Sequence, residues 1–263
     1  MEAVPVRKTF RLIGMLAALA FAMPAIGADD LAAYLAAVSS KLDPRAAEAL
    51  VRLDGTGRQL LAARSYLRSG ESLSERWSWS QQQIDDYQGS PAQAQLDAEI
   101  TRVRLEFELE NPGFTLFVNP GVRSLDVQIE HWNSNASVAE AAEELLLAAN
   151  AFLVSGTIAE ANTPVGRDAF ANFLLAHTPL PAPTIAAPGL SPHGQMRAVD
   201  FHIETAGQTV AGPDTQTIES VWLAEGWRNK LSAAVIASGA EFVGPLEKPD
   251  EPWHYSYYGA LEP

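Results

Sequence analysis

The sequence predicts an α+β protein in which helices flank a small, mostly antiparallel sheet and a helical N-terminal region precedes it. Three observations predict this fold class. Apolar residues recur at helical spacing over long stretches, and short aromatic or β-branched runs lie well apart from one another. Along the chain these elements follow the order α, β, α, α, β, α, β, which favours an α+β domain.

The composition of the chain excludes several classes of protein and of functional site. With 263 residues, 47% of them hydrophobic, the chain can bury a core as one large domain or two small ones. Its 18 Lys and Arg against 32 Asp and Glu give a net charge of −14, which argues against binding to nucleic acid or anionic membranes. The chain has no cysteine, which excludes disulfides, thiolate metal sites and cysteine nucleophiles.

Residues 1–28 have the features of a secretory signal peptide. Basic residues precede an almost wholly apolar run over 12–21, and the segment 25–28 ends in small residues. The apolar run is only about half of the roughly 20 residues that a spanning helix needs, so a membrane anchor is the weaker interpretation. We expect cleavage after Gly27 or Ala28 and export from a bacterial cell, to the periplasm or outside it, with no membrane span left afterwards.

The first half of the remaining chain is expected to be mainly helical. Over 29–90, leucine, valine and tyrosine recur three and four residues apart, with a break at 54–57. Another helix is expected over 91–109, because the Asn-Pro-Gly run at 111–113 terminates it. The aromatic and β-branched residues of 114–118 then predict a strand.

The second half is expected to combine helices with two further strands. Helical spacing predicts an inserted helical segment over about 138–177, followed by a proline-rich connector at 179–188. After the connector we expect a strand, a helix and a strand, over 198–203, 217–238 and 253–258.

Two short motifs late in the chain combine histidine with carboxylate residues. Residues 191–200 have the pattern S-x-H-x-x-x-x-A-x-D, and residues 251–254 have the pattern E-x-W-H. Two neutral imidazoles and one carboxylate can bind a metal ion and leave it with positive charge and an open position for water. Because side chains alternate along a strand, a turn must lie between His193 and Asp200 if both are to approach one metal.

These motifs resemble those of the D-alanyl-D-alanine metallopeptidases, the zinc carboxypeptidases and dipeptidases grouped with lysostaphin and the Hedgehog signalling domain. The resemblance implies that His193, Asp200 and His254 bind one zinc ion and that Glu251 is the general base. It also implies a Hedgehog/D,D-peptidase-like fold for a zinc peptidase domain over 91–263, with 138–177 as an insertion. Residues 29–90 match no part of the family.

A third match lies upstream of the zinc motifs. The strand expected at 114–118 leads into Gly-Val-Arg-Ser at 121–124, and a glutamine follows the arginine after five residues, as in the family. In the carboxypeptidase branch this arginine lies in the substrate pocket, where its planar guanidinium can hold a terminal carboxylate at two points. We therefore expect substrate contacts from four side chains, those of Arg123, Gln128, Ser191 and Trp253.

Some of these residues also have structural interpretations. Gln128 can serve only to hydrogen-bond the backbone, Ser191 can form a turn before a proline, and Trp253 can belong to the core or line the cleft. The chain also departs from the family at two positions. Met196 stands where the family usually has glycine, and Val122 stands where it usually has an aromatic residue.

Together these features predict an exported zinc metallopeptidase that acts on the stem peptides of bacterial peptidoglycan. The expected activity is that of a D,D-carboxypeptidase, which releases a terminal D-Ala. Two alternatives stay open: an endopeptidase of the same family that cuts an internal cross-link, and a peptidase fold that has lost turnover and binds the cell wall. Measured metal content together with hydrolysis of peptidoglycan distinguishes an enzyme from a binding module.

Overall fold

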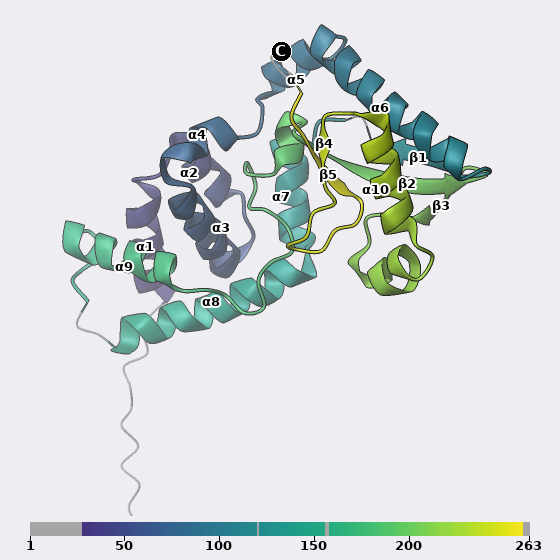
Figure 1. The fold of residues 1–263 in the computed structure, drawn as a ribbon. Helices are drawn as coiled ribbons and strands as arrows, with labels where there is room; N and C mark the ends of the chain where they lie inside the picture. The colour runs from purple at the N-terminus through teal and green to yellow at the C-terminus, as the bar shows by residue number, and fades with distance from the viewer. Residues whose placement is uncertain (1–27, 120, 156–157, 260–263) are drawn as a thin grey trace, which may run out of the picture.

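A computed structural model of the chain shows two lobes, one built of helices alone and one that contains a sheet (Figure 1). The structure describes residues 28–119, 121–155 and 158–259, and within these ranges every helix is too short or too polar to cross a lipid bilayer. The described residues form an α+β protein with a small antiparallel sheet, which confirms the expected fold class at this level. The expected signal peptide at 1–28 lies outside the described residues apart from Ala28.

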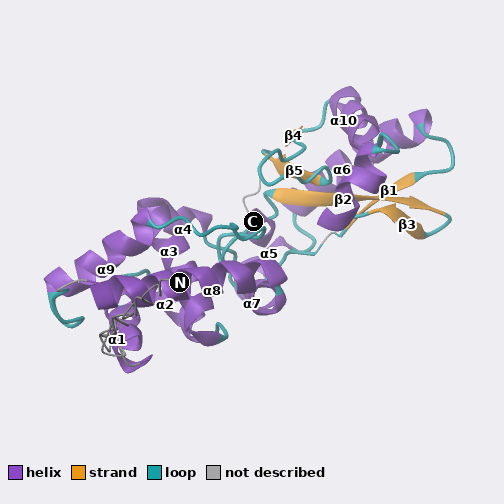
Figure 2. Ribbon diagram, turned by 90° about the horizontal axis from the view of Figure 1, so that it is seen from below, coloured by secondary structure: helices purple, strands orange, loops and turns teal. Residues whose placement is uncertain are grey.

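The helical lobe combines two stretches of chain that are far apart in sequence. Its helices are α1 to α4 and α7 to α9, with the bounds Ala28–Ser39, Pro44–Val51, Gly55–Ser69, Leu73–Arg76, Leu125–Ser134, Ala136–Ser155 and Pro164–Ala176. A short 3₁₀ turn, Gly70–Ser72, separates α3 from α4. Figure 2 shows this group of helices on one side of the molecule and the strands on the other.

One hydrophobic core holds these two stretches together. Helices α3 and α8 approach so closely that a side chain at Gly57 would lie 2.6 Å from the carbonyl oxygen of Ala142, which leaves room only for glycine. Buried apolar side chains of these helices fill the core, among them Leu60, Trp132, Leu145 and Phe170. The helices expected within 29–90 therefore share their core with those of the expected insertion at 138–177.

The sheet lobe contains the strands and the helices α5, α6 and α10. The bounds of the three helices are Gln81–Tyr87, Pro91–Glu110 and Trp227–Ser238. The strands β1 to β5 are Thr115–Val118, Ala198–Thr205, Gln208–Ala211, Phe242–Val243 and His254–Tyr257. The sheet has the order β1-β2-β5-β4, with β3 also paired to β2, and each of these pairs is antiparallel.

Strand β2 is the centre of this lobe and separates its core from the candidate site. Every second residue of β2, Val199, Phe201 and Ile203, is buried against a core to which α6 and α10 contribute. Because side chains alternate along a strand, Asp200 and His202 point to the opposite face. The long strand thus presents Asp200 and His202 on the face opposite to this core.

Three features of the fold differ from the sequence-based expectations. The helix expected over 217–238 is interrupted: a 3₁₀ turn, Thr215–Thr217, and a π-helix, Ile218–Leu223, precede α10, and Gly226 at a φ of 71° lies between them and α10. A left-handed residue cannot continue an α-helix, so the expectation of one continuous helix is wrong. Helix α7 and the short strands β3 and β4 were not expected, because segments this short show little periodicity.

Candidate metal centre

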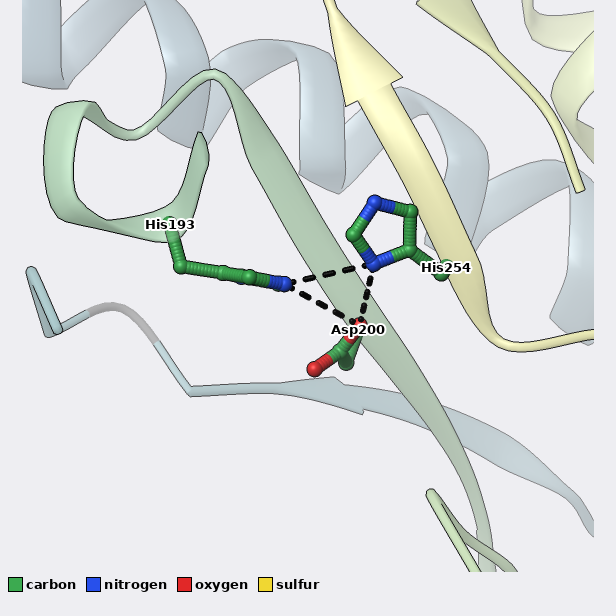
Figure 3. Close-up of side chains that lie close together, drawn as sticks. All are labelled: His193, Asp200 and His254. Carbon is green, nitrogen blue, oxygen red and sulfur yellow. Dashed lines mark hydrogen bonds and ion pairs between the residues drawn. The ribbon is translucent and has the colours of Figure 1, made fainter. Parts of the chain in front are cut away.

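Three side chains from two motifs lie close together beside strands β2 and β5 (Figure 3). Nδ1 of His254 lies 3.1 Å from Oδ1 of Asp200 and 3.2 Å from Nε2 of His193. The third side of this triangle, from Nε2 of His193 to Oδ1 of Asp200, measures 3.6 Å. These three residues are the ones that the sequence motifs predicted as metal ligands, and they form a group that can bind a metal ion.

The register of two strands brings Asp200 and His254 together. Strands β2 and β5 are antiparallel, and Asp200 is the direct cross-strand partner of His254. Residues opposite each other in an antiparallel pair project to the same face with their Cβ atoms about 4.5–5.5 Å apart. Backbone hydrogen bonds of the sheet therefore determine the relative position of these two side chains.

A tight turn brings His193 to the same place. His193 lies in a short 3₁₀ helix, Pro192–Gln195, and the next residue, Met196, has a φ of 53° and a ψ of 21° in the left-handed region. The chain then reverses into β2, which begins at Ala198. This is the turn that the separation of His193 from Asp200 required, and the left-handed residue occupies the position where the family that the motifs resemble usually has glycine.

The donor atoms have the spacing of a tetrahedral metal site. Ligand distances of about 2.0–2.2 Å to nitrogen and oxygen imply donor–donor separations of about 3.3–3.6 Å in a tetrahedron. The observed separations of 3.1, 3.2 and 3.6 Å lie close to this range. Two imidazole nitrogens and a carboxylate oxygen are also a donor set that suits zinc. The residues present therefore fit the implied ion.

The surroundings of His193 and Asp200 favour the protonation states in which these two groups bind a metal. The side chain of His193 is 11% exposed, and its burial lowers the pKa to about 4 despite the nearby carboxylate of Asp200. The imidazole is therefore neutral at neutral pH, the form that binds metals. Burial alone would raise the pKa of Asp200, but the hydrogen bond with His254 and the charges of His193, His254 and Arg123 together lower it to about 2.

Glu251 lies beside the three ligands. Its Oε2 is 3.6 Å from Nδ1 of His254, and a chain reversal between β4 and β5 places it there, because the N–H groups of Glu251 and His254 donate to the carbonyl oxygens of Leu246 and Glu251. Burial raises the pKa of Glu251 above its usual range, although the charges of His254 and Arg123 oppose the shift. A carboxylate with a raised pKa next to a metal site is suited to accept and return a proton.

Arg123 contacts the site through the outer oxygen of Asp200. Its guanidinium nitrogen lies 3.2 Å from Oδ2 of Asp200, whereas Oδ1 faces the two histidines. The side chain of Arg123 is 34% exposed, so part of the guanidinium can still meet a ligand from solution. The structure thus brings Arg123 to the site and gives it a partner that the sequence did not suggest.

The other three expected substrate contacts lie around the site in different ways. Gln128 is 4% exposed, and its amide is hydrogen-bonded to Ser78, Arg123 and Gly189. Trp253 is 3% exposed and packs against a second tryptophan in the core of the sheet lobe, so its position matches the core interpretation. Ser191 is buried in the turn, and its carbonyl oxygen accepts a hydrogen bond from the N–H of Gly194.

Two further residues lie near the site, and of these only Ser78 could not be expected from the sequence. His202 lies two residues after Asp200 on the same face, and its ring makes an edge contact with Phe117, its cross-strand partner on β1. Ser78 lies far upstream in the segment between α4 and α5, yet its hydroxyl accepts a hydrogen bond from Gln128. No local motif marks Ser78, because only the packing of the two lobes brings it close.

Comparison with known proteins finds no match. No protein-family model, no curated protein and no solved structure matches the chain. The assignment of a function therefore depends on the motifs and on the geometry of the site.

Proposed function

We propose that this protein is an exported zinc metallopeptidase with a Hedgehog/D,D-peptidase-like fold, which acts on peptidoglycan stem peptides as a D,D-carboxypeptidase. The observation that carries the proposal is the convergence of His193, Asp200 and His254 with a partly buried Glu251 beside them. Three ligands and an adjacent carboxylate base are what peptide hydrolysis at one zinc ion requires. The order of the motifs along the chain supports the same family.

The residues of the chain divide the chemistry between them. A zinc ion held by the three ligands would supply a Lewis acid that activates water and polarises the scissile carbonyl. Glu251 takes the proton of the attacking water and returns it to the leaving amine. Arg123 holds the terminal carboxylate of the substrate through its exposed part, while its contact with Asp200 fixes the direction of the guanidinium.

Substitution of Glu251 by glutamine tests the catalytic part of the proposal. We expect purified wild-type protein to contain about one zinc ion and to cleave peptides ending in D-Ala-D-Ala. Glu251→Gln should keep the zinc and lose at least about 100-fold in turnover, because the amide cannot accept the proton. The measurements are metal content by mass spectrometry and product masses after digestion of stem peptides. Wild-type protein that is fully active without metal would contradict the proposal.

The choice between carboxypeptidase and endopeptidase depends on Arg123. If its guanidinium holds the terminal carboxylate, a peptide with a free C-terminus should be cleaved and the amidated peptide should be a poor substrate. Arg123→Lys should keep zinc but reduce kcat/KM for the free peptide about 30-fold or more, because an ammonium cannot make the paired contact. Equal cleavage of both peptides, unchanged in Arg123→Lys, would favour the endopeptidase. Retention of peptidoglycan without cleavage would favour a binding module.

A further inference from the structure

An extended segment between the lobes lies against the turn that carries His193. Within residues 77–79, the N–H of Ser78 donates to the carbonyl oxygen of Gly189 at 2.8 Å, and the N–H of Trp79 donates to that of Gly194 at 2.9 Å. Trp77 is buried in the core of the helical lobe, whereas Trp79 is buried in the core of the sheet lobe. The segment is therefore fixed at both ends and supports the turn from one side.

Gln128, on helix α7 of the helical lobe, joins this segment to the turn. Its Nε2 donates to Oγ of Ser78 and to the carbonyl oxygen of Arg123, both at 2.7 Å, and its Oε1 accepts from the N–H of Gly189 at 2.9 Å. We call Ser78 and Gln128 with these bonds the Gln128 bracket. The side chain of Gln128 is almost fully buried, so removal of its amide would leave polar groups of three segments without partners.

The bracket touches the turn directly next to the metal ligand. A side chain at Gly194 would place its Cβ 2.1 Å from Oγ of Ser78 and 2.7 Å from Nε2 of Gln128, so the turn has no freedom to move towards the bracket. On the other side, the N–H of Arg123 donates to the carbonyl oxygen of His193 at 3.2 Å, and Gln128 holds the carbonyl of the same arginine. His193 is thus enclosed between residues that the bracket fixes.

From these contacts we infer that Ser78 and Gln128 are positioning residues for the metal ligand His193, and that the helical lobe is thereby a necessary part of the metal centre. The inference rests on the proposed metal site but concerns its assembly, not the reaction. Asp200 and His254 need no such support, because strand pairing fixes them. The N-terminal part of the helical lobe matches no part of the family that the motifs resemble. In this inference the helical lobe sets the position of the one ligand that lies outside the sheet.

Metal affinity of bracket variants tests this inference. Gln128→Met keeps the length of the side chain and removes its polar atoms, and Ser78→Ala removes a single hydroxyl. The control is Asn133→Ala on the same helix α7, since Asn133 bonds the backbone of Asp54 and Arg52 at 3.0 and 3.3 Å within the helical lobe. Zinc affinity would be measured by competition with a chelator, the absorption spectrum of the cobalt(II)-substituted protein would report ligand geometry, and thermal unfolding would report stability.

We expect Gln128→Met to weaken zinc binding about 10- to 100-fold and to change the cobalt spectrum, because outer partners that orient a ligand have effects of this size. Ser78→Ala should show the same spectral change and a loss of about threefold or more, and it decides the question if Gln128→Met does not fold. Asn133→Ala should lower the unfolding temperature but keep the affinity and the spectrum.

The inference and the proposed function would be contradicted by different results. If the bracket variants unfold more easily but bind zinc with wild-type affinity and spectrum, the bracket is only structural and the inference is wrong. If wild-type protein binds zinc and the bracket variants bind it weakly while no peptide is cleaved, the inference stands and the proposed peptidase activity fails. Wild-type protein that binds no metal would overturn both.

Discussion

The paired strands β2 and β5 and the turn before β2 position their candidate metal ligands in different ways. Asp200 and His254 are direct partners across two hydrogen-bonded strands, so their separation follows from sheet geometry. His193 stands on a 3₁₀ turn that ends in a left-handed methionine and is enclosed by hydrogen bonds from distant segments. One pair of ligands is therefore set by local register, whereas the third is set by contacts between the lobes.

This difference shows where the metal centre can fail. Register within a sheet is strongly specified when one face is buried, because a slip of one residue would move Val199, Phe201 and Ile203 out of the core. The turn has no such protection, since its geometry depends on Met196 and on contacts with Ser78 and Gln128. Substitutions near the turn should change metal affinity more readily than substitutions in the surrounding sheet.

Removal of a candidate ligand should weaken zinc binding more than any other substitution. The loss of affinity should be large whether the ligand lies on the paired strands or on the turn. We expect His193→Ala, Asp200→Ala and His254→Ala each to weaken zinc binding by at least about 100-fold, because each removes one of only three protein ligands. The measurement is zinc content after dialysis, together with affinity from chelator competition. Full zinc content in any of the three variants would show that the residue is not a ligand.

Substitutions at Met196 should distinguish the effect of the backbone conformation of the turn from the effect of its side-chain packing. Met196 is 3% exposed and left-handed, so Met196→Gly keeps the backbone conformation but loses the buried side chain. We expect a loss of about 1–3 kcal/mol in the free energy of unfolding, with zinc affinity nearly unchanged.

Met196→Val is the opposite case, because a β-branched residue does not adopt the left-handed conformation readily. The substitution should distort the turn and weaken zinc binding about 10-fold. An effect of this size is typical when a residue that orients a metal ligand is lost. Chelator competition and denaturant unfolding of both variants check the pair. Loss of zinc from the glycine variant would contradict the importance of the turn conformation.

The smallest effect is expected far from the centre, at Ala206, which is also a left-handed residue other than glycine. Ala206 and Gly207 have φ values of 50° and 74° and form the exposed turn between β2 and β3. Asparagine tolerates this conformation better than alanine, so Ala206→Asn should stabilise the fold by about 0.5–1 kcal/mol without a change in zinc affinity. Denaturant unfolding measures the change, with Ala206→Val as a destabilising control. Greater stability in the valine variant would contradict the assigned turn geometry.

Much of the fold was predictable because its signals are local. The helix at Pro91–Glu110 and the strand at Ala198–Thr205 lie within a few residues of the expected ranges 91–109 and 198–203. The expected helix at 217–238 was wrong in its continuity, because helical spacing continues through Gly226 while the backbone does not. The shared core of the helical lobe was not predictable, since it joins stretches that no periodicity connects.

The sequence by itself pointed to the side chains of the candidate metal centre, because its motifs resemble those in which a metallopeptidase family holds zinc with two histidines and an aspartate beside a glutamate. It also determined that a turn must separate His193 from Asp200, since strand geometry demands it. Only the tertiary structure decided that Asp200 forms an ion pair with Arg123. It also decided that the amide of Gln128 forms hydrogen bonds with Ser78, Arg123 and Gly189. These contacts join segments far apart in the chain, and their energies come from burial and hydrogen bonding that exist only after the lobes have packed.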